Sequence, residues 1–134
     1  MSVKKAKAPQ FSNCISDFCK MVDGAIRDYE WNREEVNRLD KLTQDYLHQL
    51  ELDGLDYGER AKVATKLADC RQLRRVSKDT AEILEPLVLF LNSEKGKGMM
   101  NLVREALGKT RKVEERMETR TYRYKVLEQG ESNE

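Results

Sequence analysis

The sequence predicts an all-α protein, an antiparallel three-helix bundle of long, coiled-coil-like helices with a short extended C-terminal segment. Charged residues make up 37% of the 134 residues and only two are proline, a composition typical of long helices. Apolar residues recur at seven-residue steps along three stretches separated by short glycine-containing turns, which place successive helices antiparallel. We therefore expect a single helical domain over residues 11–127, between a disordered basic arm (1–10) and a disordered tail (128–134).

The first helix is expected from Phe11 to Leu52. Six heptads run along it with nearly unbroken register, interrupted by the polar Asn32, and a polar residue in such a seam can fix register and partner number. This seam is longer than one partner helix would cover, so we expect a homo-oligomer. The two apolar rows are Phe11, Phe18, Ala25, Asn32, Leu39, Tyr46 and Ile15, Val22, Tyr29, Val36, Thr43, Leu50.

The second helix is expected from Asp56 to Leu91, after a tight turn at Gly54, which suits the left-handed conformation at a helix end. Asp56 and Glu59 form a capping pattern at its start. Pro86 predicts either a kink or the start of a separate short helix, and continued apolar spacing favours the kink. The rows are Val63, Cys70, Ser77, Leu84, Leu91 and Arg60, Leu67, Arg74, Ala81, Val88.

The third helix is expected from Met99 to about Arg120, after a turn formed by Asn92 to Gly98. Beyond Thr119 the heptad spacing stops and tyrosines alternate with basic residues. That segment could be fraying helix, an extended arm or a short edge strand. The apolar rows of the third helix are Met99, Ala106, Val113 and Val103, Thr110, Met117.

The charge is unevenly distributed although the net charge is only +1. Residues 28–59 hold ten acidic and three basic residues. Residues 60–79 hold two acidic and seven basic residues, and residues 104–125 hold four acidic and eight basic residues. Such asymmetry indicates either pairing of an acidic first helix with basic later helices or a binding face. No long apolar run predicts a membrane span, and three cysteines without a signal peptide predict a reducing cytoplasm.

Polar residues interrupt the apolar seam at the middle of the chain. Folding back at Gly54 and again at Lys95 places six residues at one level. This arrangement predicts either an internal polar layer, in which Glu114 pairs with Arg74 because a buried arginine needs a partner, or a cavity for an anionic ligand. The six residues are Tyr29, Asn32, Arg74, Ser77, Glu114 and Arg116.

The sequence does not favour an enzyme or a metalloprotein. His48 is the only histidine and no cysteine pair has standard metal or redox spacing. Neighbouring carboxylates such as Glu34 and Glu35 diverge on a helix surface, whereas general acid–base catalysis needs convergence. The Gly108–Lys109 pair lacks the earlier glycine of a phosphate-binding loop. We therefore expect no catalytic residue, no metal site and no cofactor.

Basic residues and tyrosines form the candidate binding surface. Arginine and lysine meet phosphate charge while tyrosine rings stack on bases, so this mixture suits nucleotides. The alternative is a solvated helix end whose tyrosines pack on a neighbour. The candidate ligand-binding residues are Arg74, Arg75, Lys78, Lys109, Arg111, Lys112, Arg116, Arg120, Tyr122, Arg123 and Tyr124.

Three segments resemble small helical accessory proteins encoded in phages and prophages of Firmicutes. They are LTQDYLHQLELDGLDYGERAKVATKLADCRQLRRVSKD, EILEPLVLFL and ALGKTRKVEERMETRTYRYKVL, which together cover roughly residues 40–127. The resemblance implies a phage-encoded protein of the bacterial host cytoplasm with an anti-defence role. The expected partner is a nucleotide-like anion, or a host defence protein that the chain inhibits or adapts, with nucleic acid as a third alternative.

Overall fold

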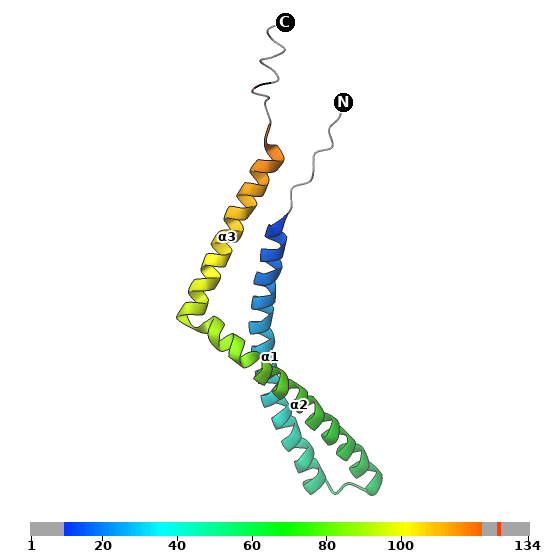
Figure 1. Cartoon of the computed structure of the whole chain (residues 1–134). Coiled ribbons are helices and arrows are strands. Elements are labelled where there is room, and N and C mark those ends of the chain that lie inside the picture. The colour runs from blue at the N-terminus through cyan, green and yellow to red at the C-terminus, as the bar shows by residue number, and fades with distance from the viewer. Residues whose placement is uncertain (1–9, 122–125, 127–134) are drawn as a thin grey trace, which may run out of the picture.

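The computed structural model describes residues 10–121 and Val126, and these contain three α-helices and no strand. They are α1 (Phe11–Leu52), α2 (Tyr57–Asn92) and α3 (Glu94–Thr119) (Figure 1). The all-α, three-helix architecture is thus confirmed. The expected arm and tail lie outside the described residues except for Gln10.

The turn between α1 and α2 forms as its residues predict. Gly54 has a φ of 57°, the left-handed conformation that only glycine adopts without strain. The Asp56 carboxylate accepts a hydrogen bond of 2.8 Å from the Glu59 N–H and so caps the start of α2. α2 then continues as one helix through Pro86, so the alternative of a separate short helix does not apply.

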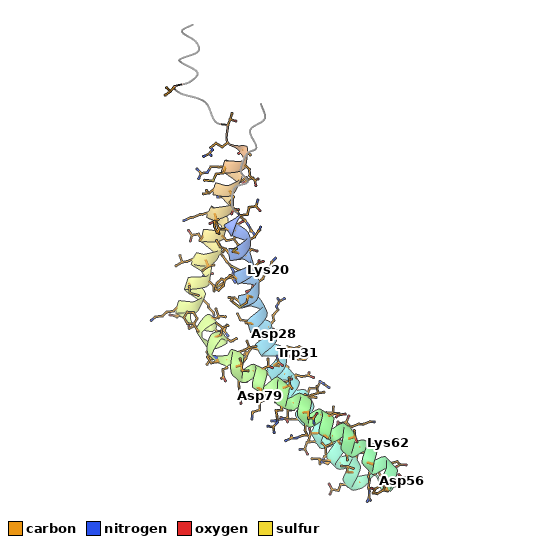
Figure 2. All side chains as sticks on the ribbon, turned by 45° about the vertical axis from the view of Figure 1, so that its right-hand side comes forward. Lys20, Asp28, Trp31, Asp56, Lys62 and Asp79 are labelled. Carbon is orange, nitrogen blue, oxygen red and sulfur yellow. The ribbon has the colours of Figure 1, made fainter. Side chains whose placement is uncertain are left out.

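α1 is the spine of the molecule, and the other two helices pack along different halves of it. α2 runs antiparallel to the C-terminal half, where Thr43 Oγ1 lies 3.5 Å from Cys70 Sγ. α3 runs antiparallel to the N-terminal half, where Arg104 contacts Asp23 at 3.2 Å. Figure 1 shows α2 crossing α1 between these two regions. In Figure 2, the labelled Lys62 lies at the hairpin end of α2, far from α3.

The three helices meet in one small apolar cluster. Cys19 and Val22 of α1 contact Leu91 near the end of α2 and Met100 near the start of α3, and all four side chains are buried. Ile15, Ile26 and Val103 pack around the cluster. The cluster holds the α2–α3 corner against α1.

Both α1 rows are confirmed beside α2, whereas beside α3 only the row that contains Ile15 and Val22 is confirmed. Ala25, Asn32 and Leu39 are buried as expected. Phe11 and Phe18 of the same row are exposed, whereas their neighbours Ser12 and Cys19 are buried. Because α3 packs on the other flank of the α1 stripe, the buried row shifts by one residue in this half.

The turn between α2 and α3 is much shorter than Asn92 to Gly98. Ser93 alone separates the helices, and its hydroxyl accepts a hydrogen bond of 3.1 Å from the Gly96 N–H, which caps α3. A Cβ on Gly96 would lie 1.9 Å from the Phe90 carbonyl oxygen. The glycine is therefore needed for close approach inside a helix, and the expectation of a glycine-rich loop here is wrong.

The expected seam of α3 is correct in part of one row and wrong in the other. Val103 and Thr110 are partly buried as expected, but Met117 at the end of the same row is exposed. The second row that faces the protein is Met100, Leu107 and Glu114, whereas the expected Met99, Ala106 and Val113 are exposed. The row that begins at Met99 and the row that begins at Met100 lie on opposite sides of the Val103–Thr110 row. α1 covers the side of the Met100 row, because Glu114 at the end of that row contacts the start of α1.

Candidate binding surface

The structure divides the predicted site residues between two places. Arg74, Arg75 and Lys78 lie on α2, which packs beside the C-terminal half of α1, and the remaining described residues lie near the far end of α3. These are Lys109, Arg111, Lys112, Arg116 and Arg120, while Tyr122, Arg123 and Tyr124 lie outside the described residues. The described residues therefore do not converge on one ligand site.

The expected pairing of Glu114 with Arg74 is wrong. Arg74 is half-buried and its Nε donates a hydrogen bond to the Asp40 carboxylate of α1. Glu114 instead contacts Ser12 near the start of α1. The expectation assumed that α3 folds back along α2, but α3 follows the N-terminal half of α1, so Glu114 and Arg116 never reach the level of Arg74.

The polar residues that remain in the middle of the seam belong to the α1–α2 interface. The buried Asn32 amide donates a 2.7 Å hydrogen bond to the Asp28 carbonyl of its own helix. Ser77 is buried, and Arg74 is satisfied by Asp40. Because each buried side-chain N–H and O–H among the described residues has a partner, this region fits an internal polar layer that sets helix register.

Lys78 borders a hollow of about 300 Å³ between α1 and α2, together with Tyr29 and Arg33 of α1. The basic residues of α2 also form a hollow on that helix alone. Its volume is about 270 Å³, and Lys78 lies 4.0 Å from Glu82. All of its lining residues come from α2, so no second element encloses a ligand. They are Arg71, Gln72, Arg74, Arg75, Lys78 and Asp79.

The basic residues of α3 are spaced more regularly along their helix. Lys109, Lys112, Arg116 and Arg120 follow one another at spacings of three or four residues and so share one flank; we call them the basic row. Lys109 pairs with Glu105 at 3.2 Å. Over residues 10–121 the other three form no ion pair within 4 Å. A line of unpaired positive charge about 12 Å long, from Lys112 to Arg120, therefore remains available to a partner.

Two solvent-open hollows border the basic row. One, of about 700 Å³, is lined by Lys109, Lys112, Val113, Glu115, Arg116 and Thr119. The other, of about 450 Å³, is lined by Val113, Met117, Arg116 and Arg120. Cationic and apolar side chains thus line both hollows, and the Glu115 carboxylate lies in the first of them.

Arg111 lies outside this row and supports a different contact. Gln10, which precedes α1, makes no side-chain cap. The Glu114 carboxylate accepts hydrogen bonds from the Ser12 N–H at 2.9 Å and the Ser12 hydroxyl at 2.6 Å, so α3 supplies a cap for α1. These bonds, together with the charge of Arg111, lower the pKa of Glu114 below its ordinary 4.5. The poor local cap before Phe11 was the only sequence signal for this contact.

Both helices of the α1–α3 pair present apolar side chains to solvent. Phe11 and Leu102 are each 67% exposed. These residues are exposed because α1 and α3 cover each other on their other flanks. We define the uncovered apolar face as Phe11, Cys14, Phe18 and Met21 of α1 with Met99, Leu102, Ala106, Val113 and Met117 of α3.

Neither a metal site nor a membrane span is found in the described part of the chain. No group of three or more His, Cys, Asp or Glu residues there could hold a metal ion. None of the described helices is long and apolar enough to cross a membrane. Comparison with known proteins found no matching family model, curated protein or solved structure.

Proposed function

We propose that this protein is a non-enzymatic protein-binding module that inhibits or adapts a host protein. The supporting observation is the uncovered apolar face, which lies beside the basic row. Large apolar side chains in water mark interaction sites when they form a contiguous patch. A protein partner would cover the apolar area and meet the charge, whereas a small anion would meet only the charge.

A nucleotide-like anion is the second candidate ligand, and the basic row is the observation that favours it. Lys112, Arg116 and Arg120 have no carboxylate partner within the described residues, and a cation without a partner attracts phosphate. Small-molecule sites are usually concave and bury most of the ligand. The open hollows beside the row fit that requirement less well than they fit a macromolecule.

The resemblance to phage and prophage proteins supplies the biological setting for this proposal. A small phage-encoded protein that occupies a host defence protein in the bacterial cytoplasm would prevent that defence from acting. The proposed activity requires neither a cofactor nor a catalytic residue, because occupancy of the partner is sufficient.

Affinity capture from host cells tests the proposal. The tagged protein should retain one host protein at constant stoichiometry, and the two purified chains should form a complex again. A parallel thermal-shift screen with linear and cyclic nucleotides tests the second candidate. Strong stabilisation by a nucleotide, without a protein partner, would reverse the order of the two candidates.

A further inference from the structure

The uncovered apolar face continues a row that α2 covers elsewhere. Phe11, Phe18, Ala25, Asn32 and Leu39 follow one another at seven-residue steps along α1. From Ala25 onward the row is buried beneath α2, while Phe11 and Phe18 are exposed. The position that α2 occupies beside one half of α1 therefore has no helix beside the other half.

α3 adds its apolar residues to the same side. The Asp23–Arg104 ion pair marks one edge of the α1–α3 interface. On the helical wheel of each helix, the exposed apolar residues lie on the flank opposite this pair. Phe18 and Leu102 consequently face the same open side of the antiparallel pair. The exposed apolar area is on the order of 600 Å², close to one partner's share of a specific interface.

The charges around this face select the kind of helix that fits it. The basic row lies along the outer border of the α3 part of the face, next to Val113 and Met117. A helix docked on the face would place its flanking residues against these cations. Acidic flanks would be attracted and basic flanks repelled.

A second copy of this chain does not offer both an uncovered apolar row and acidic flanks beside it. The acid-rich part of the chain lies mainly in α1 after residue 28. The apolar row of that part is already covered by α2, as the burial of Asn32 and Leu39 shows. A nucleic acid would use the basic row but would leave Phe18 and Leu102 in water.

We infer that the uncovered apolar face and the basic row together bind an acidic amphipathic helix of another protein. This helix lies beside the N-terminal half of α1, in the position that α2 occupies beside the C-terminal half. This inference rests on the proposed protein-binding function and names its partner class. The apolar residues of the partner helix cover Phe18, Met21 and Leu102, and its acidic flank meets Lys112 and Arg116. This is helix-in-groove recognition, with anchors at heptad spacing.

Two designed peptides of about 20 residues, roughly 30 Å of helix, test the inference. Both carry leucine and isoleucine at the seam positions and are stapled so that each is helical alone. One has glutamate along its flanks and the other has lysine. Fluorescence anisotropy at physiological salt should show the glutamate peptide binding the full-length protein at least about tenfold more tightly.

Matched variants locate the site. Leu102→Glu should weaken binding of the glutamate peptide by at least about tenfold, because it places charge in the apolar contact. Leu73→Glu is the control, since Leu73 is also exposed, at 58%, but lies on α2 outside the face. Circular dichroism should show both variants equally folded.

A charge reversal provides a readout that misfolding cannot imitate. The double variant Lys112→Glu/Arg116→Glu should lose the glutamate peptide and gain the lysine peptide. The corresponding reversal on α2, Arg71→Glu/Arg75→Glu, should leave the preference unchanged.

Other occupants of the face would give different results. Equal binding of both peptides would overturn the inference, as would an oligonucleotide that competes with the glutamate peptide. A dimer that Leu102→Glu dissociates would assign the face to a second copy. If a captured host protein binds wild type and Leu102→Glu equally, the inference fails while the proposed function stands. If no host protein is captured and neither peptide binds, both fail.

Discussion

Replacing Gly96 with alanine tests the corner between α2 and α3. The added Cβ would lie 1.9 Å from the Phe90 carbonyl oxygen and 2.8 Å from the Leu91 Cα, where real Cβ atoms do not approach within 3.0 Å. The backbone must therefore move by about 1 Å. Overpacking of this kind costs about 1–3 kcal/mol and at a rigid backbone more, while alanine returns about 1 kcal/mol of helix propensity. We expect a net loss of about 2 kcal/mol.

Thermal unfolding followed by circular dichroism measures this loss. For a domain of this size, about 2 kcal/mol corresponds to a decrease in Tm of roughly 6–10 °C. Gly98→Ala and Gly108→Ala are matched controls on the same helix, because nothing lies within 4 Å of their added Cβ atoms. Both should gain about 0.5–1 kcal/mol. If Gly96→Ala melts at or above the wild-type temperature, the close approach of the two helices does not exist in solution.

Three further predictions concern the contacts along α1. Arg74→Ala should cost about 1–2 kcal/mol in urea unfolding, because the pair with Asp40 is only partly shielded from solvent, and Arg74→Met should recover most of that loss. The lowered pKa of Glu114 means that its contact with Ser12 stabilises the protein above pH 4.5 and loses this effect as the pH falls through the folded-state pKa. Ser12→Ala should therefore lower Tm at neutral pH but not in strong acid; an equal effect at both would contradict the assignment. The length of the α1 seam predicts a homo-oligomer, but α2 and α3 together cover that seam except at Phe11 and Phe18. Sedimentation at micromolar concentration should therefore show a monomer, and a dimer would support the homo-oligomer instead.

The sequence predicted the helices because their signals are local. Phe11–Leu52 has the bounds that its periodicity indicates, and the capping pattern of Asp56 locates the start of α2. The exception is the start of α3. Its two early glycines indicated a turn, since glycine is a poor helix former, but close packing on Phe90 requires one of them inside the helix.

The relative positions of the helices could not be predicted because they depend on which flank of a broad apolar stripe is covered. On α1, the rows containing Phe11 and Ser12 flank the same central residues, and only the place of α3 decides between them. Among the described basic candidates Arg74 is half-buried, and the others are exposed. The basic groups of α2 and α3 lie apart in space because α3 follows the N-terminal half of α1, and no spacing within α3 reveals that course.

The bond between Ser12 and Glu114 joins residues 102 positions apart in the chain. During synthesis the amide groups at the start of α1 leave the ribosome before α2 and α3, but their capping carboxylate is made 102 residues later. The α1–α2 hairpin can form earlier, because its contacts require only residues up to about 92. The first turns of α1 therefore stay frayed on the nascent chain until α3 is released. A stalled or truncated product would expose this end to proteases, while the hairpin would remain protected.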